Sequence, residues 1–421
     1  MQKFQKHDIS DFKQRALQWA SLFDTACYFD SNQYTDRYSS FDVLIAAGSK
    51  YQVQANAGNA FTQLNDFLAE HDGYKLGYFG YDLKNEIEHL SSENPDNLDF
   101  PDLYFFVPQH LILLKGTEVY IDSEEPELLF NEINGQQKEI STDETKSFKT
   151  RSRFSEATYL KTVEHLKQHI LRGDIYEVNL CQEFYAEGAS INPLAMFRQL
   201  NAASPTPFAN FFRLRDKYII SATPERYLRK RGNKLISQPI KGTAPRGQDP
   251  ETDALNREML RKDQKEQAEN VMIVDLVRND LTRCAAPGSV AVEELFGVYS
   301  FKQVHQMIST VVCEADPKLA NADIIRNTFP MGSMTGAPKV RAMEFIEQYE
   351  RAKRGVYSGA VGYFSPGGDF DFNVIIRTIL YNATRKYLSF QVGSAITYEA
   401  DPSREYQECL LKASAIKTIL K

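Results

Sequence analysis

The chain has 421 residues, of which 42% are hydrophobic, and its formal net charge at pH 7 is −7. This length and composition predict a globular protein with a sizeable core. Lysine and arginine are dispersed along the chain, so no basic patch of the kind that nucleic-acid binding needs is evident, and we expect no nucleic-acid partner.

Targeting signals are not evident. Charged residues such as Lys3, Asp11 and Arg15 interrupt the first thirty residues, which therefore lack the apolar centre of a signal peptide. No run reaches the roughly 18 apolar residues of a membrane-spanning helix. We expect a cytoplasmic protein with no membrane partner. The five cysteines are far apart and outside Cys-x-x-Cys and Gly-x-Cys-x-Gly patterns, which predicts reduced thiols and no cysteine amidotransferase nucleophile in this chain.

Residues 1–150 alternate short apolar runs with polar turns, which predicts a β-rich N-terminal subdomain with strands near 41–46, 76–81 and 111–114. Residues 134–153 are polar and indicate an exposed linker. We therefore predict a boundary near residue 150 and a catalytic region over 151–421, with both halves in one intertwined unit.

The segment after the linker alternates helix and strand patterns. Ser155 is placed to cap a helix that ends at Gly173, and Asn192 begins another. Successive antiparallel strands are expected over 208–240. Glu225 lies between two of these strands. If they pair as a hairpin, Glu225 and Lys241 return to one end of the sheet, which would place a carboxyl and an amine in one site.

Two prolines restrict the backbone of residues 237–247 and two glycines permit unusual backbone shapes, which predicts a rigid, non-helical turn. The turn would hold Lys241 in one place. A lysine amine becomes a nucleophile when its pKa is lowered by burial or by a nearby cation, and Arg246 is a candidate cation. The alternative is an ordinary solvated lysine in a loop.

The predicted helix over 264–283 carries two carboxylates on its apolar face. At 3.6 residues per turn, Glu266 and Glu269 align with Ile273 and Leu276. Carboxylates that point toward a core need a partner, which is either an arginine or a hard divalent cation such as Mg²⁺.

A second carboxylate pair, Glu405 and Glu408, lies in the helix that begins at Pro402, and we expect Glu408 to share the buried face with Leu411 and Ala415. Two helices that each present an inward Glu-x-x-Glu could together form one metal site with open positions for water and substrate.

Residues 329–339 combine small residues with a predicted helix start at Pro338, which is typical of an anion site at a helix N-terminus but also of a structural turn. Three strands are then expected over 357–364, 370–381 and 387–398. Arg377 in the second strand needs a partner, either a bound carboxylate or an internal glutamate. In the third strand, the break predicted at residues 393–395 would allow backbone to approach a ligand.

Considered together, these motifs resemble the chorismate-utilising enzymes over about residues 155–421. The matching segments, in chain order, are Gly173-Asp174-Ile175, Thr223-Pro224-Glu225-Arg226, Pro239-Ile240-Lys241-Gly242-Thr243, Glu266-x-x-Glu269, Asp275-Leu276-Val277-Arg278-Asn279-Asp280, Gly336-Ala337-Pro338-Lys339, Gly359-Ala360-Val361-Gly362-Tyr363, Ile376-Arg377-Thr378 and Glu405-x-x-Glu408. The resemblance implies an α+β fold in which two antiparallel β-sheets pack together and helices flank them.

The resemblance also implies roles for single residues. Lys241 would add to C2 of chorismate while Glu225 protonates the leaving C4 hydroxyl, and ammonia would then attack C4. The glutamates would hold Mg²⁺ directly or through water. Substrate-binding positions would be Thr243, His305, Tyr357, Arg377, Gly393, Ser394 and Ala395. For His305 the alternative is a histidine of the core. Lys339 could be a surface residue.

Lys241 decides which reaction is expected within the family. It favours enzymes that aminate chorismate at C4, the first step of p-aminobenzoate and folate synthesis, because anthranilate synthases have alanine at this place. The alternatives are amination at C2 with release of pyruvate, an isochorismate synthase and a non-catalytic chorismate-binding protein. Because the chain shows no glutaminase signature, we expect ammonia from a separate glutaminase subunit.

Overall fold

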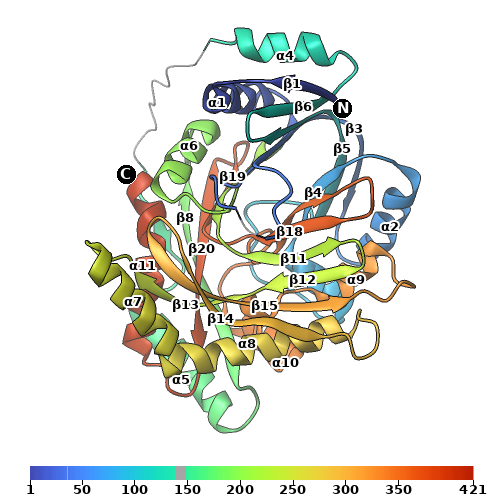
Figure 1. Ribbon diagram of the computed structural model, residues 1–421. Coiled ribbons are helices and arrows are strands. Elements are labelled where there is room, and N and C mark those ends of the chain that lie inside the picture. Colours follow the sequence, from blue (N-terminus) through green and yellow to red (C-terminus); the bar gives the residue numbers. More distant parts are fainter. Residues whose placement is uncertain (36, 138–147, 421) are drawn as a thin grey trace.

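Two antiparallel sheets diverge from one long strand in this computed structural model, which describes residues 1–35, 37–137 and 148–420. Strand β5 (Leu103–Lys115) pairs along one side with β3, while its other side pairs with β6 near one end and with β4 near the other. We call the arm that includes β3 and β6 sheet 1, and the arm that continues through β4 sheet 2. In Figure 1, β8 and β20 of sheet 1 cross the direction of β11, β12 and β15 of sheet 2.

Sheet 1 runs in the order β1-β6-β5-β3-β2-β9-β10-β19-β20-β8, and β7 and β16 also pair with β8 at its far end. Its other strands are β1 (Gln2–Gln5), β2 (Thr25–Asp30), β3 (Val43–Ala55), β6 (Glu118–Asp122), β7 (Arg151–Ser152), β8 (Glu177–Glu187), β9 (Phe208–Leu214), β10 (Lys217–Thr223), β16 (Gly336–Ala337), β19 (Thr378–Asn382) and β20 (Tyr387–Ile396).

Sheet 2 runs from β5 in the order β4-β17-β18-β11-β12-β15, and β13 and β14 both pair with β15 at its far end. Its strands are β4 (Lys75–Phe79), β11 (Arg226–Arg231), β12 (Lys234–Gln238), β13 (Ile240–Pro245), β14 (Ala291–Ser300), β15 (Val304–Glu314), β17 (Ala360–Phe364) and β18 (Phe370–Val374).

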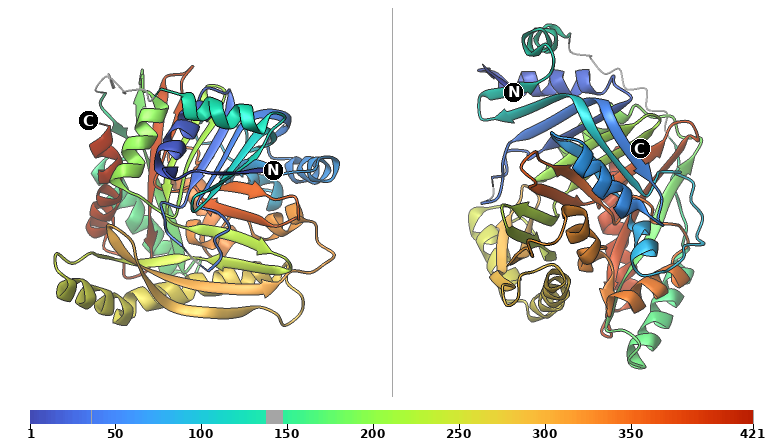
Figure 2. Two further views of the ribbon diagram at one scale, coloured as in Figure 1. Left: turned by 45° about the horizontal axis from the view of Figure 1, so that its top comes forward. Right: turned by 90° about the vertical axis from the view of Figure 1, so that its right-hand side faces the viewer.

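Helices cover the outer faces and the ends of the two sheets (Figures 1 and 2). They are α1 (Ile9–Ala20), α2 (Ala60–Glu70), α3 (Lys84–Ile87), α4 (Pro126–Gly135), α5 (Glu156–Leu171), α6 (Pro193–Ala203), α7 (Pro250–Lys262), α8 (Gln264–Thr282), α9 (Asn321–Thr328), α10 (Lys339–Tyr349) and α11 (Pro402–Ile419), with short 3₁₀ turns at Tyr81–Leu83 and Gly332–Met334. The predicted α+β class is confirmed. Across the described ranges, no helix has both the length and the apolarity to cross a membrane.

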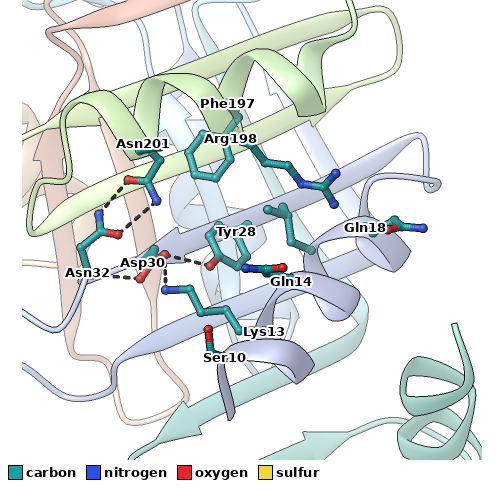
Figure 3. Close-up of a pocket in the computed structure, with 12 residues that line it drawn as sticks. Ser10, Lys13, Gln14, Gln18, Tyr28, Asp30, Asn32, Phe197, Arg198 and Asn201 are labelled. Carbon is teal, nitrogen blue, oxygen red and sulfur yellow. Dashed lines mark hydrogen bonds and ion pairs between the residues drawn. The ribbon is translucent and has the colours of Figure 1, made fainter. Parts of the chain in front are cut away.

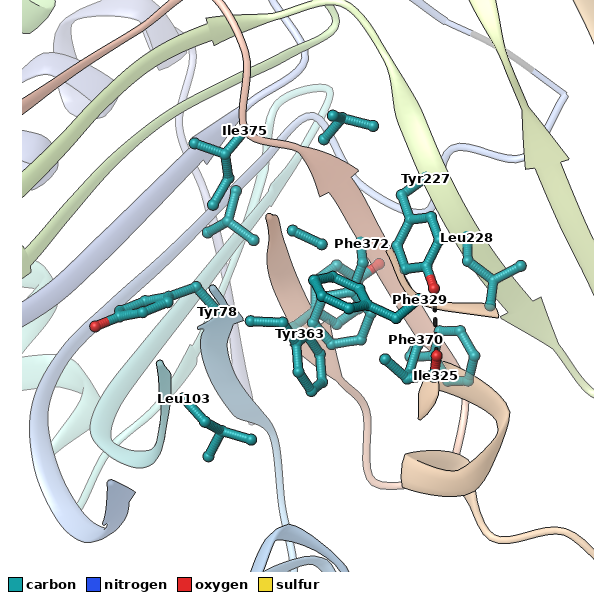
Figure 4. Close-up of a cluster of buried hydrophobic side chains, with 14 of the residues drawn as sticks. Tyr78, Leu103, Tyr227, Leu228, Ile325, Phe329, Tyr363, Phe370, Phe372 and Ile375 are labelled. Carbon is teal, nitrogen blue, oxygen red and sulfur yellow. Dashed lines mark hydrogen bonds between the residues drawn. The ribbon is translucent and has the colours of Figure 1, made fainter. Parts of the chain in front are cut away.

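Two hydrophobic clusters hold these layers together, and alternation along the strands of sheet 1 separates them. Phe212 of β9 belongs to the cluster between the sheets, whereas its neighbour Phe211 packs on the helices outside sheet 1. Between the sheets, Phe212 meets Tyr78 of β4 edge-on with 5.6 Å between ring centroids. Figure 4 shows part of this inner cluster around Phe372 and Phe329. The inner cluster fixes how the two sheets meet, and therefore where their far ends lie.

Several predicted elements are confirmed. Ser155 caps α5 by accepting from the amide of Thr158, and the α6 cap is Asn192. Residues on either side of position 150 form neighbouring strands, since β2 pairs with β9 and β4 with β17. The boundary near residue 150 stays a prediction, and residues 138–147 of the predicted linker lie outside the described residues.

Candidate active site

Glu225 and Arg377 lie where the chain crosses from one sheet to the other. Glu225 joins β10 to β11, and Arg377 joins β18 to β19. The crossings are adjacent, because the amide of Val374 donates to the carbonyl of Glu225 at 3.0 Å and that of Ala222 to the carbonyl of Arg377 at 3.2 Å. The strand predicted over 370–381 is therefore wrong in one respect: it breaks before Arg377, whose φ is 51°.

The predicted return of Glu225 and Lys241 to one end of a hairpin is confirmed. Strands β11 and β12 pair antiparallel, with Arg226 opposite Gln238, so the residues just outside the hairpin come together. Glu225 is 5% exposed. Burial raises the pKa of its carboxyl to about 7, although Ser333, the Ile240 amide, Lys241 and Arg377 oppose the shift. A carboxyl with this pKa is suited to give a proton near neutral pH.

Arg377 carries a guanidinium in the same region. Burial lowers its pKa, while the nearby carboxylate of Glu225 acts in the opposite direction. A cation at the meeting point of two sheets can bind a carboxylate of a ligand. Glu225 is thus the internal glutamate near Arg377. Binding of a substrate carboxylate by Arg377 stays a prediction.

Lys241 lies between two carboxylates on different elements. Its Nζ is 3.4 Å from Oε1 of Glu177 on β8 and 3.5 Å from Oε2 of Glu269 on α8. Burial lowers the pKa of Lys241, but Glu177, Glu269 and Glu408 raise it by more, so the pKa lies above its ordinary value. The prediction of a lowered pKa for Lys241 is therefore wrong. Arg246 does not supply the expected cation, because it pairs with Asp253 at 2.7 Å.

Glu177 is a site residue that the sequence reasoning missed. Its side chain is 3% exposed and pairs with Lys241. The available signal was an acidic residue directly between the apolar Tyr176 and Val178 in a predicted strand. Such an acid needs a buried partner. Which partner it has depends on the meeting of β8 with β13, and these strands belong to different sheets.

The four predicted metal ligands come from two helices on opposite sheets. Helix α8 packs against β13 and β15 of sheet 2, and α11 packs against β20 of sheet 1. Burial and the adjacent Glu269 raise the pKa of Glu266. Burial also raises that of Glu405, which accepts from the hydroxyl of Ser394. The opposing positions of α8 and α11 bring these carboxylates toward one region.

The expectation for Glu408 is wrong. The buried stripe of α11 runs through Glu405, Cys409 and Ala413, whereas Leu411 is 72% exposed. The side chain of Glu408 is 47% exposed and lies 2.7 Å from Lys412. Burial raises its pKa, but Lys412 and Lys241 lower it by more, with a net decrease. The buried face of α11 is therefore offset by one residue from the predicted face, so that Glu405 faces the sheet and Glu408 does not.

The donor set fits a hard cation in its chemistry, since it offers only carboxylate oxygens. In the described residues, however, no three acidic, histidine or cysteine side chains are already gathered at metal-binding distance. Ammonium groups lie among the carboxylates instead: Lys265 is 3.6 Å from Glu269, and Lys241 and Lys412 occupy the positions given above. These lysines show that the cluster attracts positive charge.

The remaining predicted positions differ in their surroundings. Thr243 is exposed on β13 opposite Gln306. His305 is fully buried, with Nδ1 2.9 Å from the hydroxyl of Ser300 and Nε2 3.0 Å from Asp253. These contacts engage both ring nitrogens, as expected of the alternative core histidine. Substrate binding by Thr243 and His305 stays a prediction.

Tyr357 is buried, and its hydroxyl lies 3.8 Å from Sγ of Cys181 on β8. Burial raises the pKa of that hydroxyl well above its ordinary value, so Tyr357 is a neutral hydrogen-bonding group at physiological pH. The tyrosine therefore lies beside sheet 1, and its contact with substrate stays a prediction.

The predicted break at Gly393, Ser394 and Ala395 is wrong, since β20 continues through them and pairs with β8. A β-carbon at Gly393 would collide with the side chains of Asn179 and Cys181, so a close approach of protein groups already requires glycine there. The Gly393 carbonyl accepts from Lys412 at 2.9 Å. The segment thus touches the acidic cluster from sheet 1.

Lys339 is not a surface residue. It is 9% exposed and lies 2.6 Å from Asp280 at the end of α8. This ion pair connects two of the sequence motifs, Asp275–Asp280 and Gly336–Lys339, and secures the end of α8 next to the start of α10.

A pocket of about 410 Å³ lies elsewhere, between α1, β2 and α6 (Figure 3). Lys13, Tyr28, Asp30, Arg198 and Asn201 are among its lining residues. The lining contains none of the predicted site residues, so this pocket is separate from the arrangement around Lys241.

Comparisons with known proteins bear on this arrangement. The model of the family described as chorismate binding enzyme matches residues 24–418. Aminodeoxychorismate synthase component 1 of Klebsiella aerogenes is 38% identical over 347 residues, covering 82% of this chain and 76% of that protein. Anthranilate synthase component 1 of Thermus thermophilus is 34% identical over 356 residues, with the same coverage of 82% and 76%.

The fold has solved counterparts. The crystal structure of anthranilate synthase component I from Streptococcus pneumoniae TIGR4 superposes with a TM-score of 0.79 at 25% identity, covering 92% of this chain and 96% of that one. The family match spans both sheets and the residues around Lys241. The chain therefore belongs to the family of chorismate-binding enzymes.

Proposed function

We propose that the chain aminates chorismate at C4 with ammonia and forms 4-amino-4-deoxychorismate, the first step of p-aminobenzoate synthesis. The observation that carries the proposal is the convergence of a buried acid, Glu225, and a lysine, Lys241, at one end of the β11–β12 hairpin. The similarity to aminodeoxychorismate synthase component 1 supports the same assignment.

In the proposed reaction, the ammonium of Lys241 first passes a proton to a neighbouring carboxylate. The resulting neutral amine adds to C2 of the ring while Glu225 donates a proton to the C4 hydroxyl, which leaves as water. Ammonia then bonds to C4, and the bond between Lys241 and C2 breaks with its electron pair going to the lysine nitrogen. The new C4 ammonium returns a proton to Glu225, and Lys241 takes back the proton that it gave to the carboxylate. In the net reaction, ammonia replaces water and the enolpyruvyl group is retained. Glu225 is suited to its part because burial raises its pKa to about 7.

Substrate recognition is assigned to groups of both signs. Chorismate is a dianion, so Arg377 would bind one carboxylate, with Tyr357 and the backbone near Gly393 beside it. Mg²⁺, held by Glu269 and Glu408 with Glu266 and Glu405 reaching its waters, would neutralise the ring carboxylate. The charges of these four glutamates would otherwise repel that carboxylate.

Mass-spectrometric product analysis tests the proposal. The purified chain is incubated with chorismate, Mg²⁺ and an ammonium salt. We expect a product that keeps the enolpyruvyl group, has an amine in place of the hydroxyl and is converted to p-aminobenzoate by a lyase. No turnover at any ammonium concentration would contradict the proposal.

The second candidate is component I of anthranilate synthase, which the 34% identity to the Thermus thermophilus protein favours. It predicts anthranilate and pyruvate in the same experiment. Finding these products would show that Lys241 does not determine where nitrogen is placed.

The ammonia source is proposed to be a separate glutaminase subunit, since relatives carry the name component 1. Mixing the chain with a candidate glutaminase should make the reaction glutamine-dependent. Activity with glutamine by the isolated chain would contradict this part of the proposal.

A further inference from the structure

The ion pair between Lys241 and Glu177 bridges the far ends of the two sheets. Lys241 belongs to β13 of sheet 2, and Glu177 begins β8 of sheet 1. The same ammonium also lies near Glu269, at 3.5 Å compared with 3.4 Å for Glu177. The two carboxylates therefore compete for Lys241, one from a strand and the other from a helix.

Glu177 is the more firmly held of the two. Its strand pairs with β16 on one side, where Glu177 is opposite Ala337, and with β20 on the other. Its side chain is 3% exposed, compared with 17% for Glu269. An ion pair with less water around it is electrostatically stronger.

The other interactions of the two carboxylates also differ. Oε2 of Glu177 is buried and has no hydrogen-bond partner among the residues that the structure describes. Glu269, by contrast, also lies 3.6 Å from Lys265. A buried charge with one partner depends on that partner, because removing it leaves the charge uncompensated.

We propose that Glu177 is the positioning residue for Lys241: its carboxylate keeps the lysine nitrogen at the end of sheet 1, near Glu225, by opposing the attraction of Glu269 on α8. This inference rests on the proposed function, in which Lys241 attacks the ring. Glu177 itself is assigned no contact with substrate.

The first test compares Glu177→Gln and Glu177→Asp with a control on the same strand. The control is Glu183→Gln, further along β8, which removes a buried carboxylate that pairs with Arg153 at 2.7 Å and not with Lys241. We expect Glu177→Gln to lower kcat about 100-fold, as a misplaced reactive group does, with KM for chorismate nearly unchanged. Glu177→Asp should recover part of the loss, and Glu183→Gln should lower Tm but leave kcat unchanged.

A second test uses stability alone and is independent of activity. Tm is measured for the native chain, Glu177→Gln, Lys241→Met and the double variant. The pair predicts coupling: Lys241→Met should lower Tm strongly in the native chain and less in the Glu177→Gln background, where no buried carboxylate is left unpaired. Lys75→Met on β4 is the matched control, and its effect on Tm should not depend on Glu177.

Independent, additive effects on Tm would overturn the pairing. Coupling in Tm together with an unchanged kcat in Glu177→Gln would overturn the positioning role. Failure of the proposed function itself would be recognised separately, because the unaltered chain would then form no 4-amino product.

Discussion

The Nζ atom of Lys241 on β13 lies 3.4 Å from Oε1 of Glu177 on β8, although the two strands lie at the far ends of two different sheets. The chain crosses between those sheets at Glu225 and again at Arg377, and these crossings lie side by side. The candidate site is therefore built where the sheets approach each other. This position brings acidic and basic groups from both sheets together without any of them being adjacent in sequence.

Removing the nucleophile is the most direct test of the proposed chemistry. Lys241→Ala should lower the rate of amination at C4 by at least about 10³-fold, because a covalent step is lost. Product formation is followed by mass spectrometry. The control is Lys234→Ala on the neighbouring strand β12. It removes an ion pair with Glu293 and should keep full activity. Full amination by Lys241→Ala would exclude the adduct.

Glu225 predicts a pH dependence. Its pKa is about 7 because burial disfavours the charged form, so the acid is protonated below that pH and ionised above it. We expect kcat to fall about tenfold per pH unit once the pH is well above 7. Glu225→Gln should lower kcat and abolish the decrease of kcat above pH 7. A decrease that persists in the variant would be due to the titration of another group.

The same pKa predicts how Glu225 affects stability. Its value in the folded chain, about 7, is above the ordinary 4.5, so the folded state binds the proton more tightly and stability falls as pH rises toward 7. Glu225→Gln abolishes this loss. The stability gain from Glu225→Gln should be about 2 kcal/mol larger at pH 8.5 than at pH 5.5. Denaturant unfolding at the two pH values measures it, and equal gains would show that the carboxyl is not buried in this way.

Metal binding can be measured without turnover. The four glutamates predict that Mg²⁺ stabilises the folded chain, by about 2.7 kcal/mol at one hundred times its Kd. A Glu269→Gln and Glu405→Gln double variant should lose the rise in Tm with Mg²⁺, and a chelator should abolish activity of the native chain. Glu258→Gln, on the exposed face of α7, should respond like the native chain. An Mg²⁺ response that survives in the double variant would place the metal elsewhere.

Arg377 should act mainly on binding. Arg377→Ala should raise KM for chorismate about 100-fold, because a partly desolvated carboxylate would lose its charged partner. The exposed Arg385→Ala provides the comparison, since Arg385 pairs with Asp99 at the surface. A KM that does not change would show that Arg377 serves Glu225 rather than substrate.

Local pattern was sufficient for much of the chain. Capping residues and apolar periodicity located α5, α6 and α8, and the hairpin argument brought Glu225 and Lys241 together because antiparallel pairing returns neighbouring strands to one end. The chorismate-binding motifs are likewise read from contiguous residues. These features depend on short stretches, so the sequence by itself determined them.

Only the tertiary structure decided the partners. The pairing of Lys241 with Glu177, that of Lys339 with Asp280 and the orientation of Glu408 depend on how two sheets and their helices pack. Apolar periodicity indicates that α11 has a buried face. It does not decide whether the sheet covers the row of residues through Glu405 or the adjacent row through Glu408. Charges far apart in sequence meet only after the apolar core has fixed the layers, and the sign of the pKa shift at Lys241 follows from those neighbours.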